Sequence, residues 1–283
     1  MQLSGEQLGQ WNEDGYLIVR GLWSAEEVAA CKAHFDGIAR GQRIENHWLP
    51  DLEASDPLKR YPRVMHPHVF SDLSKRMMLD ARIGKILEQL MGEEPIATQS
   101  MFYYKPPGGK GQALHQDNYY LQVRPKSCVA AWTAIDRAHP DNGGLYVCPG
   151  THTYEVKCPE LANPEESFTT HFVRPPDGTE PVPAVLEPGD VLFFNGSVVH
   201  GSKPNHSKDW RRSLICHYVP ISTESMSDYY ASKLRFNGST FEIAPTEGGG
   251  PCGTEFPDGF VPFDWNKAKE LGMKPVLRGS IPE

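Results

Sequence analysis

The residue types and spacing best suited to binding a metal ion are those of a histidine and an aspartate close together in the sequence. His115 and Asp117 lie two positions apart in Leu114-His-Gln-Asp117, and on a β-strand such a pair points to one face. An imidazole nitrogen and a carboxylate oxygen on one face can share a metal ion. Sites with two histidines and one carboxylate leave coordination positions open and are typical of non-haem Fe(II) oxygenases. The pair alone is weak evidence, because a polar surface strand has the same pattern.

The remaining ligand is expected on a facing strand far away in the sequence. His200 follows an apolar strand and a turn and comes directly after two valines; in isolation it would be interpreted as a core histidine. Arg211 opens a further strand and shares a face with Ser213, whereas Arg212 points to the other face. A guanidinium binds a carboxylate in bidentate fashion, and the hydroxyl of Ser202 would add one donor. This region therefore suits a dicarboxylate beside a metal.

Helices are expected in the first third of the chain. Ser24 and Glu27 form a capping box ahead of apolar residues at helical spacing, which predicts a helix over 24–40. Further helices are predicted over 4–13 and 71–91, and a strand over 16–19. His66 and His68 are also two apart, but no carboxylate follows at a suitable spacing, and they are interpreted as loop residues.

The pattern changes near residue 95 to short β-favouring runs separated by glycine, proline and asparagine, which is typical of a sandwich or barrel. The runs cover 101–104, 128–135, 145–147, 191–194 and 214–219. Residues 155–184 lack periodicity, and loops of this length tend to be lids or binding loops. We expect one domain over 1–283, with a helical part over about 1–95, a β core over about 96–220 and an irregular tail over about 221–283.

Composition narrows the choice of partners. A net charge of −8 gives no basic footprint for nucleic acid and no polybasic membrane patch, and no apolar run is long enough to span a bilayer. The acidic N-terminal segment is unlike a signal peptide, and six scattered cysteines without a CxxC motif favour reduced thiols. We therefore expect a cytoplasmic protein that acts on a small molecule; the sequence does not indicate an oligomeric state.

Taken together, the motifs resemble the phytanoyl-CoA dioxygenase-like family of Fe(II)/2-oxoglutarate oxygenases. The matching segments occur in the family order over residues 6–220; they are Asp14-Gly-Tyr16, Lys105-Pro-Pro-Gly108, His115-Gln-Asp117, Ala131-Trp-Thr-Ala134, Asn142-Gly-Gly144, Pro149-Gly-Thr-His152, Glu187-Pro-Gly-Asp190, His200-Gly-Ser-Lys-Pro-Asn205 and Arg211. The resemblance implies a mainly β fold with flanking α-helices, built on a double-stranded β-helix (a cupin-like jelly-roll).

The resemblance also implies the site residues and cofactors. His115, Asp117 and His200 would hold Fe(II), with 2-oxoglutarate as co-substrate and O₂ as oxidant. Five residues would contact the co-substrate: Arg211, Ser202, Trp132, Met101 and Arg63. Candidate substrate contacts are Tyr103, Asn118, Tyr120, Trp48 and Trp210.

The expected reaction is hydroxylation or oxidation of a small molecule with release of succinate and CO₂. Related halogenases lack the carboxylate ligand, so the presence of Asp117 argues against halogenation. Two alternatives remain: a cupin-like metalloenzyme that does not use 2-oxoglutarate, such as an isomerase or hydrolase, and a non-catalytic binding module on the same fold. The substrate is left open among an acyl-CoA, an amino-acid derivative, a phosphonate and a natural-product intermediate.

Overall fold

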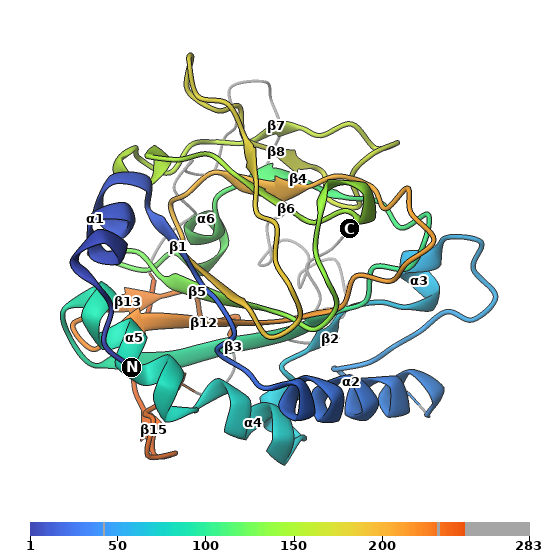
Figure 1. Ribbon diagram of the computed structural model, residues 1–283, viewed down its shortest axis with the longest axis horizontal. Coiled ribbons are helices and arrows are strands. Elements are labelled where there is room, and N and C mark those ends of the chain that lie inside the picture. The colour runs from blue at the N-terminus through green and yellow to red at the C-terminus, as the bar shows by residue number, and fades with distance from the viewer. Residues whose placement is uncertain (42, 231–232, 247–283) are drawn as a thin grey trace, which may run out of the picture.

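The computed structural model describes residues 1–41, 43–230 and 233–246. Its larger sheet is antiparallel and runs in the order β1 (Tyr16–Val19), β10 (Val191–Asn195), β5 (Val129–Ala134), β12 (Ser213–Pro220), β3 (Pro95–Tyr103), β14 (Lys233–Leu234) and β15 (Thr240–Phe241), with β2 (Val64–Met65) also paired to β3. The smaller sheet runs in the order β4 (Gln112–His115), β11 (His200–Ser202), β6 (Leu145–Val147) and β9 (Val182–Pro183). The two sheets form the two layers of the jelly-roll core expected from the sequence (Figure 1).

Helices cover the outer face of the larger sheet. The helices are α1 (Gly5–Asp14), α2 (Ala25–Arg40), α3 (Pro57–Arg60), α4 (Asp72–Met78), α5 (Ala81–Met91) and α6 (Asp117–Leu121), with 3₁₀ turns η1 (Pro67–Val69), η2 (Pro140–Asn142) and η3 (Thr151–Thr153). In Figure 1, α2, α4 and α5 lie against this sheet on the side away from the smaller one. The predicted capping box of α2 is present, with Ser24 accepting from the Glu27 backbone N–H.

The core divides into layers because successive residues of a strand point to opposite faces. On β12, Leu214 and Cys216 pack in a cluster that includes Phe35 of α2. Ile215 instead joins a second cluster, with Trp132 of β5, between the two sheets. This inner face carries the residues of the candidate site.

Two short strand pairs stand apart from the main sheets. One lies in the 155–184 loop and pairs β7 (Glu160–Leu161) with β8 (His171–Phe172). The other lies in the described part of the tail and pairs β13 (Ser225–Met226) with β16 (Ala244–Pro245). Residues 221–246 therefore contribute short strands rather than irregular chain alone, and the rest of the predicted tail lies outside the described residues. No helix in the described ranges is long and apolar enough to cross a membrane.

The cysteines partly match the sequence-based expectation. Cys31, Cys128, Cys148 and Cys216 are buried free thiols. Cys158 is disulfide-bonded, so the expectation of a reduced thiol is wrong at this position.

Candidate active site

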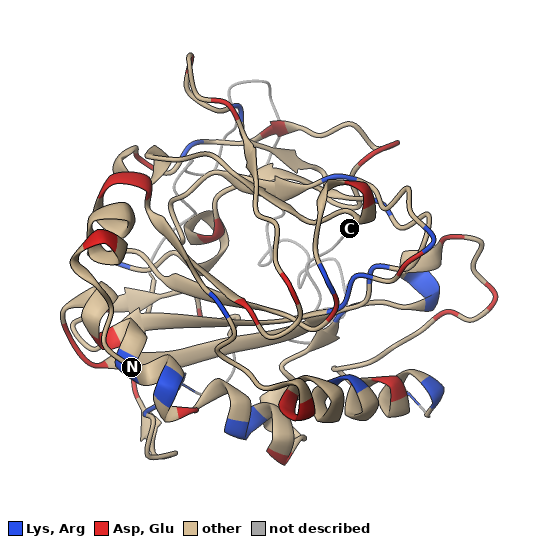
Figure 2. Ribbon diagram, in the orientation of Figure 1, with Lys and Arg blue, Asp and Glu red and all other residues tan. Residues whose placement is uncertain are grey.

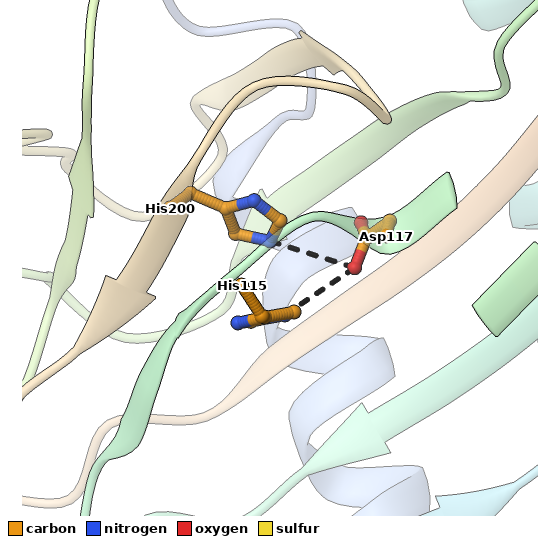
Figure 3. A group of neighbouring side chains, drawn as sticks. All are labelled: His115, Asp117 and His200. Carbon is orange, nitrogen blue, oxygen red and sulfur yellow. Dashed lines mark ion pairs between the residues drawn. The ribbon is translucent and has the colours of Figure 1, made fainter. Parts of the chain in front are cut away.

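Two neighbouring strands and a short helix bring three buried side chains to one point. His115 ends β4, His200 begins β11, and the two are direct partners in the antiparallel pairing of these strands. Asp117 Oδ1 lies 3.4 Å from His115 Nε2 and 3.5 Å from His200 Nε2. Figure 3 shows the three side chains converging. One potential ligand atom from each of the three side chains lies within 4.8 Å of the other two. In the described part of the chain, no other three histidine, cysteine, aspartate or glutamate side chains come this close together.

The local backbone differs from the predicted single strand. β4 ends at His115, Gln116 is still extended, and Asp117 is the first residue of α6. The expectation that His115 and Asp117 share one strand face is therefore wrong. The first helical turn nevertheless returns the carboxylate to the imidazole, so that the pair meets as the metal hypothesis required.

Hydrogen bonds fix the tautomers of both histidines. His115 Nδ1 lies 2.8 Å from the Ala113 carbonyl oxygen, and His200 Nδ1 lies 2.9 Å from that of Val198. A carbonyl only accepts hydrogen bonds, so each Nδ1 carries the hydrogen and donates. Each Nε2 then presents a lone pair to the shared centre, as in metal sites where an outer partner orients the ligating imidazole.

Electrostatics favour the ligating protonation states. Burial lowers the pKa of His200 to about 4, which keeps its imidazole neutral near pH 7. Burial alone would raise the pKa of Asp117, but the neighbouring His200 and His217 lower it well below its usual range. Two imidazoles that present Nε2 lone pairs and one carboxylate are the donor set that suits non-haem Fe(II). The residues present therefore fit a ferrous ion.

Gln112 also faces this centre. Its side-chain Nε2 lies 3.0 Å from His115 Nε2 and donates to the lone pair of that nitrogen. This hydrogen bond has to give way when Nε2 binds a metal, so Gln112 marks the position where a ligand displaces a protein contact.

The triad opens into a cavity of about 120 Å³ between the two sheets. All five residues predicted to bind the co-substrate line it: Arg211, Ser202, Trp132, Met101 and Arg63. Tyr103 and Tyr120, predicted as substrate contacts, line it as well.

Three predicted substrate contacts do not line this cavity. Asn118 closes the turn after α6, because its Oδ1 accepts from the Val123 N–H at 2.9 Å. Trp48 is only 1% exposed and packs in the core under the larger sheet, with its ring 5.3 Å from that of Tyr104. Trp210 packs edge-on against Tyr61. The prediction that these residues contact substrate is therefore not supported, because aromatic and amide side chains serve core and turn equally well.

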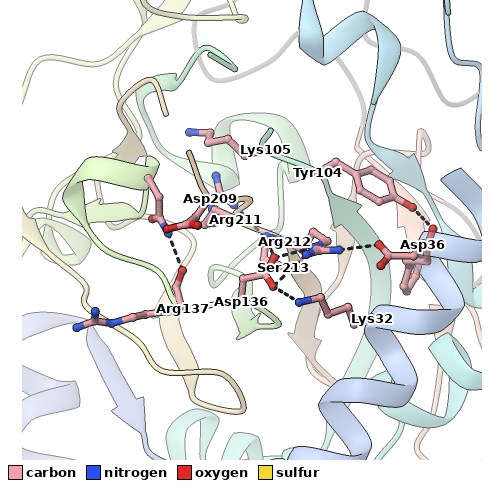
Figure 4. A network of polar contacts seen from close by, with 12 residues as sticks. Lys32, Asp36, Tyr104, Lys105, Asp136, Arg137, Asp209, Arg211, Arg212 and Ser213 are labelled. Atoms are coloured by element: carbon pink, nitrogen blue, oxygen red, sulfur yellow. Dashed lines mark hydrogen bonds and ion pairs between the residues drawn. The ribbon is translucent and has the colours of Figure 1, made fainter. Parts of the chain in front are cut away.

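Arg211 places a buried cation at the cavity wall, with no ion-pair partner among the residues that the structure describes. It is 3% exposed, its guanidinium lies over the Trp132 ring at 5.4 Å, and its Nη1 donates to Ser213 Oγ at 3.1 Å. Burial lowers the pKa of Arg211 to about 10, which still leaves it charged at neutral pH. Arg212 points the other way, as predicted, and is paired with Asp136 in the network of Figure 4.

Ser202 is oriented to donate a hydrogen bond. Its Oγ accepts from Lys105 Nζ at 2.8 Å and from the Gln112 backbone N–H at 3.2 Å. With both lone pairs engaged, the hydroxyl hydrogen is free to point to an acceptor in the cavity. Lys105, labelled near Arg211 in Figure 4, is itself 2% exposed. The Lys105-Pro-Pro motif was recognised in the sequence, but its lysine was not assigned a role.

His217 is a second residue that the sequence interpretation missed. Its Nε2 lies 2.9 Å from Asp117 Oδ2, the carboxylate oxygen that is not the one near His115 and His200. His217 lies on β12, six positions after Arg211, which comes just before this strand; strict alternation along an extended chain places the two on the same face. That alternation was the signal available in the sequence.

Part of the long loop over 155–184, which the sequence predicts to be a lid or binding loop, lines the cavity. We call residues 167–171 the strap; Phe168, Thr169, Thr170 and His171 line the cavity. The strap is tied to the chain before His115, because the Phe168 N–H donates to the Gly111 carbonyl at 2.9 Å. Across the cavity, His171 Nδ1 lies 3.0 Å from Tyr120 Oη.

Comparisons with known proteins relate the chain to dioxygenases and hydroxylases. The family model described as "Phytanoyl-CoA dioxygenase (PhyH)" matches residues 11–213. The peroxisomal phytanoyl-CoA dioxygenase of Rattus norvegicus is 28% identical over 270 residues, which cover 90% of this chain and 80% of the rat protein. A methylphosphonate hydroxylase of Gimesia maris is 28% identical over 249 residues, 87% of this chain and 91% of that protein. The peroxisomal phytanoyl-CoA dioxygenase of Mus musculus is 30% identical over 76% of this chain and 68% of the mouse protein.

Solved structures share the fold. EctD from S. alaskensis with 2-oxoglutarate and 5-hydroxyectoine has a TM-score of 0.62 at 23% identity, covering 78% of each chain. The epimerase SnoN, in complex with Fe³⁺, α-ketoglutarate and nogalamycin RO, has a TM-score of 0.60 at 21% identity, covering 77% of this chain and 84% of SnoN. At these identities, the likeness establishes the jelly-roll architecture.

Proposed function

The chain belongs to the phytanoyl-CoA dioxygenase family and is an Fe(II)/2-oxoglutarate-dependent dioxygenase, and we propose that His115, Asp117 and His200 hold its iron. The observation that carries this proposal is the convergence of two oriented Nε2 lone pairs and one carboxylate oxygen. When bound, iron with 2-oxoglutarate and O₂ supplies the oxidising chemistry that modifies a small-molecule substrate and releases succinate and CO₂.

Arg211 and Ser202 bind the distal carboxylate of 2-oxoglutarate in this proposal. The support is a buried guanidinium with no carboxylate partner among the described residues and a serine hydroxyl whose hydrogen is free. Trp132 and Met101 form apolar walls that exclude water from this part of the cavity. In such a dry setting, a charge-assisted hydrogen bond is stronger than it is in water.

Lys105 and His217 act as positioning residues. Lys105 donates to Ser202 Oγ and to the carbonyl oxygens of Gly143 and Lys203, which holds the serine hydroxyl in one orientation. His217 holds one oxygen of Asp117 and leaves the other for the metal.

The helical part and the β core form one domain in this proposal, because residues from Leu3 to Leu234 share a single hydrophobic cluster. The cytoplasmic location expected from the sequence is also part of the proposal. The alternatives that do not use 2-oxoglutarate have no observation in their favour.

The test is 2-oxoglutarate-dependent succinate formation by the Fe(II)-loaded protein. Arg211→Met removes charge-assisted hydrogen bonds of about 1.5–3 kcal/mol, so the KM for 2-oxoglutarate should rise at least tenfold. Arg137→Met, which removes an exposed arginine paired with Glu187, is the matched control and should leave the KM unchanged. An unaltered KM in Arg211→Met would overturn the co-substrate assignment.

A further inference from the structure

The floor of the cavity is formed by β3 and β12 of the larger sheet. Three alternate residues of β3 line it: Gln99, Met101 and Tyr103. Their partners in the antiparallel pairing with β12 are, in the same order, His217, Ile215 and Ser213. At about 3.4 Å per residue, Gln99 and Tyr103 are roughly 13 Å apart along the strand, so the floor has two distinct ends.

The Tyr103 end of the floor carries the positive charge. Arg63 Nη1 donates to Tyr103 Oη at 3.3 Å, and Arg211 Nη1 donates at 3.1 Å to Oγ of Ser213, the β12 partner of Tyr103. The sequence predicts both arginines to contact 2-oxoglutarate, and the two carboxylates of that molecule match their two charges. This end of the cavity therefore belongs to the co-substrate.

The Gln99 end of the floor carries uncharged groups. The β12 partner of Gln99 is His217, which is hydrogen-bonded to Asp117. Tyr120 and Tyr230 also line the cavity, and both Asp117 and Tyr120 lie within electrostatic range of Tyr230. Among the described residues that line the cavity, Asp117 is the one carboxylate, and it is a proposed metal ligand. A substrate at this end therefore meets no free charge.

Gln99 and Tyr230 are buried polar side chains that line the cavity without a protein partner. Gln99 is 4% exposed and Tyr230 is 5% exposed. Within residues 1–41, 43–230 and 233–246, no group forms a hydrogen bond with the Gln99 carboxamide or with Tyr230 Oη. Polar groups this deeply buried are nearly always hydrogen-bonded. Their hydrogen-bonding capacity is therefore left for molecules that enter the cavity.

Tyr230 lies outside residues 11–213, which match the family model. Its ring packs with Leu121 and Met226 in a buried cluster, and the Ser227 N–H donates to the Leu121 carbonyl at 2.8 Å. These contacts fasten the described part of the tail to the end of α6. The chain thereby adds to the cavity a side chain that the family match does not cover.

We propose that Gln99 and Tyr230 bind an uncharged group of the primary substrate that both donates and accepts hydrogen bonds, as an amide or an alcohol does. This inference rests on the proposed function and extends it to the class of substrate. A carboxamide presents an N–H donor and a carbonyl acceptor side by side, and a phenol hydroxyl does both with one oxygen. Because Gln99 adjoins His217, the bound group lies on the Asp117 side of the triad.

A charged group is excluded from this end of the cavity. His171, whose Nδ1 lies 3.0 Å from Tyr120 Oη, is uncharged near neutral pH because burial lowers its pKa. A carboxylate, phosphate or ammonium group there loses its hydration and gains no counter-charge, which is costly. The substrate group held by Gln99 and Tyr230 is therefore neutral.

The experiment uses the anaerobic complex of the whole chain with Fe(II) and saturating 2-oxoglutarate, whose charge-transfer absorption responds to changes around the metal. The probes share one chain length and differ in one group: butyramide and 1-butanol are uncharged, whereas butyrate and butylammonium carry a charge. All titrations are made at constant ionic strength. Gln99→Leu and Tyr230→Phe each remove the hydrogen-bonding group and nearly keep the size of the side chain. Tyr154→Phe, at an exposed tyrosine, is the matched control.

We expect at least one uncharged probe to perturb the absorption of the wild type saturably, and both charged probes to bind more weakly. Loss of one neutral hydrogen bond corresponds to about three- to tenfold in affinity, so Gln99→Leu and Tyr230→Phe should each weaken binding of the uncharged probe by this factor. Tyr154→Phe should bind it as the wild type does, and the affinity for 2-oxoglutarate should be the same in all these proteins. The probe that responds distinguishes an amide from an alcohol substrate.

Thermal unfolding separates binding from packing. Neither side chain forms a hydrogen bond within the described part of the chain, so Gln99→Leu and Tyr230→Phe should leave the melting temperature of the ligand-free protein unchanged or slightly raised. A side chain that served only the fold would lower the melting temperature when replaced.

Four results would overturn the inference while leaving the proposed function intact. They are a normal absorption that neither uncharged probe perturbs, tighter binding of a charged probe, wild-type binding of the uncharged probe by either variant, and weaker binding accompanied by a lower melting temperature. Absence of the charge-transfer absorption from the wild type would instead contradict the proposed function itself.

Discussion

The carboxylate of Asp117 has two oxygens with different partners. Oδ1 faces the Nε2 atoms of His115 and His200, whereas Oδ2 receives the Nε2–H of His217. A carboxylate held in this way offers the metal one oxygen, which keeps the remaining coordination positions available for co-substrate and O₂. The partner that orients a metal ligand thus contributes to affinity without touching the metal.

Replacing His217 should therefore weaken iron binding. In His217→Ala, Asp117 Oδ2 loses its donor and the carboxylate can rotate, so Fe(II) affinity should fall about 10–100-fold. His217→Gln, which keeps an N–H donor, should recover part of the loss. Equilibrium dialysis against Fe(II) under anaerobic conditions measures the affinity, and thermal unfolding of the metal-free variants controls for packing. Wild-type affinity in His217→Ala would show that the hydrogen bond does not orient the ligand.

At the scale of elements, the site depends on how closely β4 and β11 approach. A Cβ on Gly111 would lie 2.0 Å from the Ser202 carbonyl oxygen, so only glycine fits between the strap and β11. The strand pair carries His115 and His200 as direct partners. A side chain at position 111 has to push these strands apart.

Gly111→Ala should lower stability and metal affinity together. Overpacking of this kind costs about 1–3 kcal/mol, and the displaced β11 no longer places His200 correctly. Gly37→Ala, in α2 with nothing within 4 Å of the new Cβ, is the matched control and should be neutral or slightly stabilising. Thermal unfolding and Fe(II) binding are the measurements. A Gly111→Ala variant that unfolds like wild type and binds iron normally would refute this account of the strand contact.

The turn around η1 gives the fold a dependence on pH. His66 is buried, lies in the left-handed region at φ 49°, and has both ring nitrogens without a hydrogen-bond partner. Burial lowers the pKa of His66 to about 4 and that of His68 to about 3. The unfolded chain, with a histidine pKa near 6.5, binds more protons below that pH. These residues therefore lower the stability of the folded state increasingly as the pH falls below 6.5, down to the folded-state pKa values of about 4 for His66 and about 3 for His68.

His66→Asn tests this dependence. Asparagine tolerates the left-handed conformation and does not titrate, so the loss of unfolding free energy between pH 7 and pH 5 should be smaller in the variant than in wild type. Urea unfolding at both pH values measures the difference. Equal losses in the two proteins would mean that His66 is not part of the acid sensitivity.

Strong local signals in the sequence predicted most elements correctly. The strand over 16–19 and the helix over 24–40 have a clear period and a capping box, and they match β1 and α2. The single helix predicted over 71–91 is wrong in its interior: α4 ends at Met78, and Asp80 caps a new helix by accepting from the Arg82 N–H. An aspartate within a helical pattern is ambiguous, because it can cap a helix or simply face water.

The site was predictable in part, for similar reasons. The motif was enough to nominate His115, Asp117 and His200, although the strand alternation assumed for Asp117 is wrong. It could not show that Asp117 opens a helix, or that Asn118 closes the following turn. The place of Asp117 depends on its contact with His217, far away in the sequence, whereas the Asn118 turn is a local contact that many polar side chains could make.

At the scale of the whole molecule, the candidate metal centre joins the two layers. His115 and His200 belong to the smaller sheet, while Arg211 adjoins β12 of the larger sheet. A ligand that contacts both layers binds only the folded chain, and so it stabilises the fold by mass action.

Fe(II) and 2-oxoglutarate together should therefore raise the melting temperature. At a ligand concentration a hundred times its Kd, the free energy of unfolding rises by about 2.7 kcal/mol. For chains of comparable size, each kcal/mol raises the melting temperature by about 2–4 °C. His115→Ala should abolish the shift without changing the melting temperature of the metal-free protein greatly. Anaerobic differential scanning calorimetry makes the comparison, and an equal shift in His115→Ala would place the stabilising ion elsewhere.

The most direct measurement is the position of iron in crystals grown anaerobically with Fe(II) and 2-oxoglutarate, located by anomalous scattering at the iron edge. We predict a single strong peak bonded to Nε2 of His115, Nε2 of His200 and Oδ1 of Asp117, with a carboxylate of 2-oxoglutarate against Arg211. A peak bonded to other side chains, or density that leaves either imidazole unbonded, would contradict the account.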